Sequence, residues 1–414
     1  MFKGLLDRSL PRFGRALHPL IDPDDLKRDT VRATALAQRQ LIELTKAIDQ
    51  VSARVDRVER IDRRQSENLE DTAQQLRHGT RQQGAFSDQL VKVANTDKRM
   101  HSIREHALRR LRHIGRSKGP VIIGPWTGEV GFELLYWAPF VRWVIQRFRI
   151  DPGRITLMSR GGTASWYGLP DVTYLDLLAR RSVKELRAHT AEAKKQRTLR
   201  VFERRLMREV AAERGRGAGF VHPAIMYAMF WPYWKRLTPE SWVCDVMQAS
   251  KITPPRVPGL ETLPRDYVAV RFYFSDCFPD TPNNRALSRS VVNALARTRD
   301  VVVIGSGVQV DDHRDANAEL QARVHTITHL LTPENNLAVQ TAVIARARSF
   351  IGTYGGFSYL APLCGVDAMS VYSVKNFHAH HLDFARRMFA EVGGGSLTVI
   401  DTAVSDLVAP LVSR

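Results

Sequence analysis

The sequence predicts an α/β protein with two Rossmann-like parallel-sheet domains that follow an N-terminal α-helical coiled coil. From residue 119 onward, short apolar runs alternate with helical patterns, and a Pro-rich stretch at 251–264 divides this region in two. Strands that alternate with helices form parallel sheets covered on both faces. Apolar residues three and four apart in 41–58 predict the coil.

Composition limits the classes of protein that fit. A chain of 414 residues with 44% hydrophobic residues is long and apolar enough for two or three folded units. Its three cysteines, Cys244, Cys277 and Cys364, are too far apart for a disulfide framework or a zinc cluster, which indicates a reducing cytoplasm. No apolar run reaches membrane-spanning length. We therefore expect a cytoplasmic protein.

The net charge of +18 predicts anionic partners, such as acidic lipid headgroups, phosphorylated substrates or nucleic acid. The chain has no zinc-finger spacing and no RNA-binding signature with interleaved aromatic residues, so no nucleic acid is expected. Residues 1–23 form a basic amphipathic segment that Pro11 interrupts. Such a segment either lies on the anionic inner face of the cell membrane or docks on its own protein.

A helical oligomerisation region is expected over 24–118. Its apolar seam steps by three and four through Leu41, Leu44, Ile48, Val51, Val55 and Val58. A stripe this narrow favours self-association into a homo-oligomer, and the alternative is one amphipathic helix packed on the body of the protein. The region ends in a basic stretch, REHALRRLRHIGRSKG, at 104–119.

The first α/β domain is expected over 119–255 and the second over 256–414. In the first, the pattern predicts strands at 120–124, 154–159 and 172–178, helices at 131–148 and 183–214, and an aromatic cluster at 222–234. In the second, it predicts strands at 267–273, 301–307, 324–330, 349–354 and 368–373, and helices at 288–298, 335–347 and 357–365.

Polar and glycine-rich turns follow several strands of the second domain, where ligands of open parallel sheets bind. Arg271 ends one strand, Gly305 and Ser306 follow another, and Thr353, Tyr354, Gly355 and Gly356 follow a third, before a helix that begins with Phe357 and Ser358. Arginine supplies charge and a fork of donors, and a helix start supplies free N–H groups. These residues suit a nucleoside diphosphate, although the glycine turn alone is equally typical of an ordinary strand-to-helix connection.

These residues carry a resemblance to a family. The strand with Arg271, the strand before Gly305, the helix with Gln340 and the segment FIGTYGGFSYLAPLCGV resemble the nucleotide-binding half of GT-B glycosyltransferases, above all fucosyltransferase-like and bacterial surface-polysaccharide enzymes. The His-x-Arg-Arg pattern of many fucosyltransferases is replaced here by VRFY at 270–273. The resemblance implies a metal-independent, inverting transfer from a nucleotide-sugar donor, with no other cofactor, to a glycan or lipid-linked acceptor in polysaccharide synthesis.

The resemblance also implies a base in the turn after the first strand, GPWTGEVGFELLYW at 124–137. Gly128 and Gly131 make this turn flexible, and Glu129 or Glu133 is the candidate that deprotonates the acceptor. Either carboxylate alternatively stabilises the helix start or is solvated. His222 is a rival base or a structural histidine, and the aromatic cluster at 222–234 either stacks on acceptor sugars or fills the core.

One histidine motif and two alternative functions remain to be considered. The segment NFHAHHLDF places His378, His381 and Asp383 near one another, but without a second ligand cluster no metal site is expected. The chain is alternatively a non-catalytic coiled-coil scaffold on a degenerate transferase fold. It is otherwise a transferase of a non-glycosyl group, such as pyruvyl, on the same architecture.

Overall fold

The computed structural model describes residues 83–192, 195–305, 314–315, 322–377 and 379–403, with side chains from residue 95 onward except that of Arg314. The chain divides into two units, Met1–Ala94 and Asn95–Arg414, and both sheets belong to the second. The amphipathic segment 1–23 and the heptad seam at 41–58 lie outside the described residues, so both stay predictions. Within the described part, no helix is long and apolar enough to cross a membrane.

The first sheet has four parallel strands in the order β3-β2-β1-β4. They are β1 (Val121–Ile123), β2 (Ile155–Ser159), β3 (Thr173–Asp176) and β4 (Gly219–Val221). Every residue of β1 and β2 is buried, which explains why the sequence shows continuous apolar runs there instead of alternation. The covering and flanking helices are α3 (Gln83–Arg116), α6 (Ala164–Tyr167), α7 (Val183–Glu192), α8 (Val201–Arg214), α9 (Pro223–Trp234) and α10 (Ser241–Cys244).

The helix expected at 131–148 contains a wider turn. It runs as α4 (Val130–Phe132), a π-helical turn (Glu133–Trp137) and α5 (Ala138–Arg147). Pro139 has no N–H for the helical ladder, and the Ala138 N–H bonds to the Glu133 carbonyl five residues back. The widened turn therefore begins at one of the two carboxylates singled out in the sequence.

The second sheet has six parallel strands in the order β12-β11-β10-β5-β7-β9. They are β5 (Tyr267–Arg271), β7 (Asp300–Val303), β9 (Val324–Thr326), β10 (Ser349–Thr353), β11 (Ala368–Tyr372) and β12 (Leu397–Asp401). Its helices are α11 (Pro282–Ala296), α12 (Asn336–Arg346), α13 (Gly356–Leu363) and α14 (Ala379–Glu391), and β6 (Tyr273–Phe274) pairs antiparallel with β8 (Arg314–Asp315). The two parallel-sheet domains expected from the sequence are thus confirmed.

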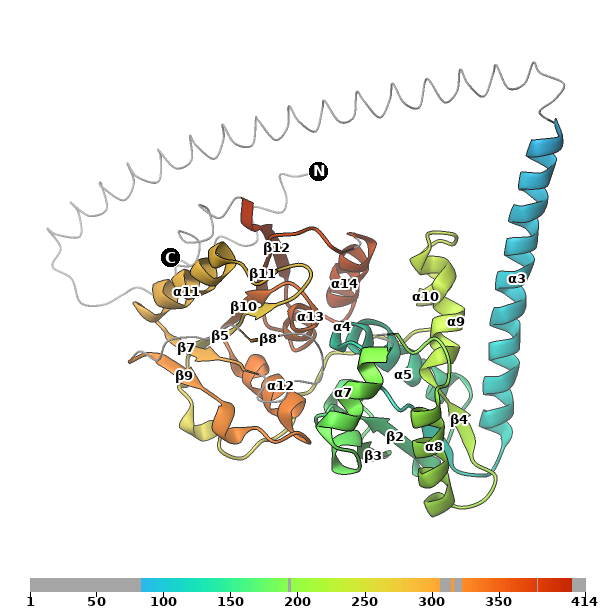
Figure 1. Ribbon diagram of the computed structural model, residues 1–414. Helices are drawn as coiled ribbons and strands as arrows, with labels where there is room; N and C mark the ends of the chain where they lie inside the picture. The colour runs from blue at the N-terminus through green and yellow to red at the C-terminus, as the bar shows by residue number, and fades with distance from the viewer. Residues whose placement is uncertain (1–82, 193–194, 306–313, 316–321, 378, 404–414) are drawn as a thin grey trace, which may run out of the picture. The chain divides into compact units, whose positions relative to one another are not determined.

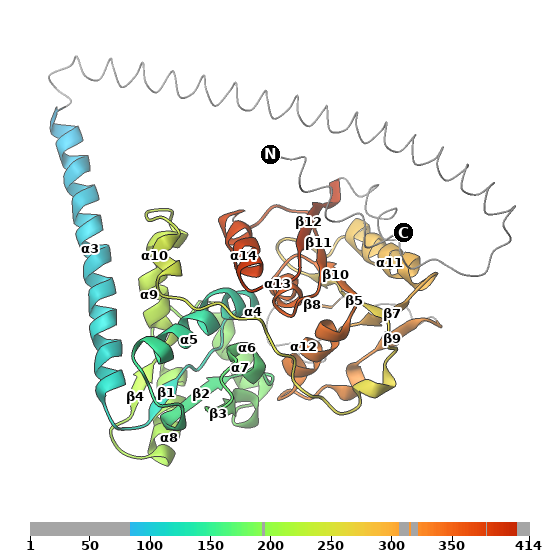
Figure 2. The same ribbon diagram turned by 180° about the vertical axis from the view of Figure 1, so that it is seen from behind.

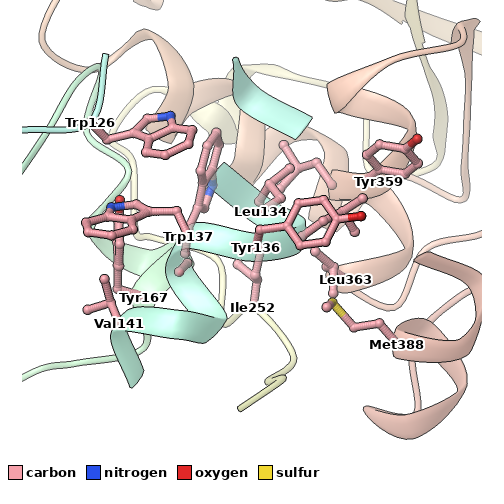
Figure 3. Packing of buried hydrophobic residues seen from close by; sticks show 14 of the residues in the cluster. Trp126, Leu134, Tyr136, Trp137, Val141, Tyr167, Ile252, Tyr359, Leu363 and Met388 are labelled. Carbon is pink, nitrogen blue, oxygen red and sulfur yellow. The ribbon is translucent and has the colours of Figure 1, made fainter. Parts of the chain in front are cut away.

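The two sheets share one hydrophobic core cluster. It contains Trp137 and Tyr136 beside the first sheet, Leu363 and Met388 beside the second, and Ile252 from the Pro-rich stretch between them (Figure 3). Helices α4 and α13 lie side by side where the two sheets meet (Figures 1 and 2). Burial on this scale stabilises the pair of domains as one unit.

Candidate active site

The carboxyl ends of two central strands, β1 and β10, are followed by turns that pack against each other. A Cβ built on Gly356, the first residue of α13, would lie 2.7 Å from the Gly131 nitrogen and 2.8 Å from Val130 Cβ. A Cβ on Gly131 would lie 3.3 Å from the Gly356 Cα. Each glycine therefore leaves room for the backbone of the opposite turn.

The loop after β2 joins the same junction. The Gly161 carbonyl accepts a hydrogen bond from the Ala338 N–H at 2.8 Å, and the Trp166 indole Nε1 donates to Thr341 Oγ1 at 2.8 Å. Both partners belong to α12 beside the second sheet. A further hydrogen bond of 2.5 Å joins the Tyr136 hydroxyl to His381 Nδ1 of α14.

Glu133 lies at this junction with a fully buried side chain. Its Oε1 accepts hydrogen bonds from Ser159 Oγ at 2.5 Å, Tyr167 OH at 2.7 Å and Thr163 Oγ1 at 3.2 Å. Its Oε2 is 3.9 Å from Arg160 Nη1. Burial raises the pKa of the Glu133 carboxyl, and the charge of Arg160 opposes that rise only in part.

Glu129 has the opposite environment. Its side chain is exposed, at the residue before α4, whereas neighbouring Gly128 is buried. Its charge contributes to the raised pKa of Tyr227, after the larger effect of burial, so the carboxylate lies near this tyrosine. Tyr227 stacks on the half-buried Phe132 ring, with Lys195 Nζ 4.9 Å from the centre of that ring. An exposed carboxylate beside aromatic and cationic groups suits contact with a sugar hydroxyl.

Arg271 lies at the end of β5 with only 6% of its surface exposed. Its guanidinium carbon is 3.8 Å from the centre of the Phe357 ring, one Nη donates to Gln340 Oε1, and the other is 3.5 Å from Asp315 Oδ1. A guanidinium stacked in this way is held rigid. Gln340, which was named in the sequence only as a helix residue, therefore positions the arginine.

The hydroxyl groups of Thr353 and Ser358, at the glycine turn, form hydrogen bonds with backbone groups of the same protein. Thr353 Oγ1 accepts from the Tyr273 N–H at 3.1 Å and donates to the Tyr273 carbonyl at 2.9 Å. Ser358 Oγ accepts from the Gly355 N–H at 3.1 Å and donates to the Thr353 carbonyl at 3.2 Å. These bonds brace the turn between β10 and α13.

The other residues predicted to bind the nucleotide-sugar donor lie around this turn or beside a segment outside the described residues. Tyr354 is buried, and its hydroxyl is 2.6 Å from that of Tyr359. A Cβ on Gly355 would reach the Tyr273 hydroxyl, and a Cβ on Gly305 would lie 3.7 Å from Asp315 Oδ2. Ser306 falls outside the described residues. Its role, like those of the other predicted donor residues, stays a prediction.

A second buried carboxylate was not singled out in the sequence. Glu203 of α8 is fully buried, and its Oε1 lies 3.2 Å from His189 Nε2 and accepts from Gln196 Nε2 at 2.8 Å. Its Oε2 is 3.2 Å from His222 Nε2 and accepts from the Arg200 N–H at 2.9 Å. Burial alone would raise the pKa of Glu203, but the bonds with His189 and His222 hold it well below its ordinary value.

Glu203 supports the turn after β1 through Gln196. The Gln196 amide donates to the Pro125 carbonyl at 2.8 Å and accepts from the Thr127 N–H at 2.9 Å. Because Glu203 binds the same amide, it fixes the turn that leads to Glu129. His222, the rival base, is 3% exposed and serves as a partner of Glu203.

The histidine segment at 376–384 contributes to packing across the junction. His381 bonds to Tyr136, as described above, and its ring is 5.5 Å from that of Phe132. Within the described residues, no group of three His, Cys, Asp or Glu side chains could hold a metal ion. His378 falls outside them.

No family model and no curated protein matches the chain. A search of solved structures finds the ADP-heptose LPS heptosyltransferase II of E. coli, with 10% identity over 71% of this chain and 98% of that one, at a TM-score of 0.37. It also finds a glycosyl transferase of family 9 from Veillonella parvula, with 14% identity over 72% and 90%, at 0.37. A third is the iron-containing dodecameric glycosyltransferase TibC from enterotoxigenic E. coli, with 11% identity and a TM-score of 0.33.

The chain covers 61% of its own length against TibC and spans 58% of the length of TibC. Each of these three structures is described as a glycosyltransferase or heptosyltransferase. At these identities and TM-scores, the function of this chain has to be argued from its own residues.

Proposed function

We propose that the protein is a glycosyltransferase that moves a sugar from a nucleotide-sugar donor to a glycan or lipid-linked acceptor in polysaccharide synthesis. One observation carries the proposal: the turn with Glu129 and Glu133 after β1 packs on the glycine turn after β10, beside Arg271. Ligands of parallel sheets bind outside the carboxyl ends of the strands. Two such ends meet here, so each can hold one of two substrates.

The second sheet would hold the donor. Arg271 offers a rigid positive charge at the end of β5, and α13 directs its N-terminus toward the same edge. A diphosphate carries negative charge that both groups attract. Asp315, 3.5 Å from the guanidinium, stands where an anion would bind and would be displaced by it.

The first sheet would supply the base. Glu129 is exposed and can reach an acceptor hydroxyl, whereas the buried Glu133 holds Ser159, Thr163 and Tyr167 in place. In the proposed step, Glu129 takes the hydroxyl proton and the acceptor oxygen bonds to the anomeric carbon. The bond from that carbon to the nucleoside diphosphate breaks, and the electron pair leaves with the diphosphate, which Arg271 stabilises. Because the acceptor oxygen attacks opposite the leaving group, the configuration at the anomeric carbon is inverted.

The test begins with donor binding. Calorimetry with ADP, GDP, UDP, CDP and dTDP should give a nucleotide-dependent affinity, followed by release of that nucleotide from its sugar conjugate when an acceptor glycan is added. Glu129→Gln should bind the donor normally and lose turnover by a factor of about 100 or more. Glu391→Gln, an exposed carboxylate on α14, is the control and should keep both. Full turnover in the Glu129→Gln protein would exclude Glu129 as the base.

A second candidate, a non-catalytic nucleotide-sugar-binding scaffold, is favoured by the internal bonding of the Thr353 and Ser358 hydroxyls. Hydroxyls that already have protein partners offer less to a ligand. This candidate predicts donor binding with no nucleotide release from any tested sugar conjugate.

A further inference from the structure

Helix α3 has two contrasting faces from Asn95 onward. Its buried face is apolar and contains Met100, Ala107, Leu111 and Ile114. The opposite face carries a row of exposed cations, which we call the basic stripe and define as Lys98, Arg99, Arg109, Arg110, Arg112, Arg116 and the adjoining Lys118. Exposed His106 and His113 lie among them. This row includes most of the basic stretch noted in the sequence, which the proposed transfer reaction does not use.

The spacing places Lys98, Arg109 and Arg116 along one line of the helix, whereas Arg99 and Arg110 lie about 100° round the helix from it. Lys98 and Arg109 are eleven residues apart and Arg109 and Arg116 are seven apart, which is about three and two turns. The helix from 98 to 116 extends for about 27 Å. The centre of the stripe is therefore a straight, solvent-facing row of positive charge, and the other cations flank it.

Within the described part of the chain, the charges of the basic stripe make no contact that would stabilise the fold. Arg104, which is not in the stripe, donates to the Trp242 carbonyl at 2.8 Å and stacks on the Trp242 ring. For the stripe residues, the described part contains no hydrogen bond or ion pair with a side chain. Asp97 and Glu105 are the acidic residues within 95–118. Arg109, Arg112 and Arg116 lie three and four residues apart, so their like charges repel and disfavour the helix.

We propose that the basic stripe binds a membrane surface rich in anionic headgroups, with α3 parallel to the plane of the bilayer. A straight row of lysine and arginine matches a flat layer of phosphates, and guanidinium groups bind phosphate oxygens in pairs. Residues 98–118 contain no Phe, Tyr or Trp side chain to stack on bases and no Asn or Gln side chain to read adenine, which favours lipid over nucleic acid. The inference does not depend on sugar transfer.

The experiment uses the full chain and sedimentation with phosphatidylcholine vesicles, with and without phosphatidylglycerol. The wild-type protein should bind only the vesicles with phosphatidylglycerol, and more weakly as salt rises. The double variant Arg109→Glu/Arg116→Glu should lose affinity by a factor of about ten or more. The matched control is Arg289→Glu/Arg297→Glu, which reverses two exposed arginines on or beside α11 and changes the net charge equally. It should stay within about twofold of wild type.

Several outcomes would overturn the proposal. An equal loss of vesicle affinity in both double variants would show that net charge alone attracts the protein. Unchanged vesicle affinity in the Arg109→Glu/Arg116→Glu protein would assign the binding to another segment, such as residues 1–23. Binding of single-stranded RNA that the stripe variant abolishes, with no vesicle binding by wild type, would make the stripe a nucleic-acid site. Equal circular dichroism melting curves establish that the variants are folded. Nucleotide affinity, measured on the same samples, reports separately on the proposed transferase.

Discussion

Gly356 at the start of α13 and Gly131 in α4 are in direct backbone contact, because a Cβ on Gly356 would lie 2.7 Å from the Gly131 nitrogen. A side chain at position 356 would therefore collide with the turn that follows β1. Gly356→Val should destabilise the protein by about 1–3 kcal/mol through overpacking. The measurement is thermal unfolding, with Gly153→Ala as the control, since a Cβ there meets only Asp151 Oδ1 at 3.5 Å. A fully stable Gly356→Val protein that has lost donor affinity would show instead that Gly356 leaves room for a bound phosphate.

Arg271→Ala should weaken binding of a nucleoside diphosphate by about 1.5–3 kcal/mol, the usual contribution of a charge-assisted hydrogen bond. Lysine at this position should recover only part of the loss, because it lacks the planar fork that stacks on Phe357. Calorimetry measures both variants. Undiminished nucleotide affinity in folded Arg271→Ala protein would place the donor elsewhere.

Asp315→Asn should change donor affinity in the opposite direction. The carboxylate of Asp315 lies 3.5 Å from the Arg271 guanidinium and competes with an anionic ligand for it. Removing that charge should tighten nucleoside diphosphate binding, by a factor of about 2–10 for a partly exposed pair. Adenosine, which carries no phosphate, is the control ligand and should bind both proteins equally. Weaker diphosphate binding by Asp315→Asn would show that Asp315 supports the donor site.

Glu133→Gln should gain stability relative to wild type as the pH rises. Burial raises the folded-state pKa of Glu133, so its contribution to stability is full below its ordinary pKa of 4.5 and is lost as pH rises through the raised value. Glutamine does not titrate. The difference in melting temperature, variant minus wild type, should therefore be more positive at pH 8 than at pH 5. A difference that stays constant across this range would mean that Glu133 keeps one charge state.

Glu203→Gln should show the reverse dependence. The folded-state pKa of Glu203 is depressed, so its stabilising contribution is present above pH 4.5 and is lost as pH falls through the lower value. At pH 7 the variant should lose about 1.5–3 kcal/mol, the usual contribution of a hydrogen bond to a charged group. The loss should shrink toward pH 3.

Glu213→Gln on the same helix is the control for Glu203. Glu213 pairs with Arg180 at the surface, where such pairs contribute about 0–1 kcal/mol. Equal losses from Glu203→Gln and Glu213→Gln would mean that the buried network adds nothing beyond a surface pair.

The strands of both sheets could largely be predicted because continuous apolar runs such as VII at 121–123 and FIGT at 350–353 have to be buried. Strand β4 has only three residues and begins with Gly219, so its apolar run is too short to stand out. Helix α14 is not predicted, because the histidines at its start draw attention to a metal site instead of to helical periodicity. The π-helical turn depends on how the helix accommodates Pro139. The spacing of apolar residues carries no information on this, so the turn could not be predicted.

The candidate site was only partly predictable because neighbours, not residue types, decide the role of each group. Glycine in a strand-to-helix turn leaves space, but the sequence does not say whether a ligand or Gly131 fills it. Glu203 belongs to a strongly charged helix and resembles its exposed neighbours until the fold brings His222 from a distant strand end. An acidic residue at an apolar phase of α8, beside buried Leu206 and Met207, was the signal that could have revealed it.

The bond from Trp166 Nε1 to Thr341 Oγ1 gives the protein a built-in optical probe. The indole is 2% exposed and joins α6 to α12, so a separation of the two sheets there would change its surroundings. The fluorescence of a buried indole lies at a shorter wavelength than that of an indole in contact with water. Emission from this tryptophan, isolated by comparison with Trp166→Phe, would therefore report opening between the sheets in real time, with no attached dye.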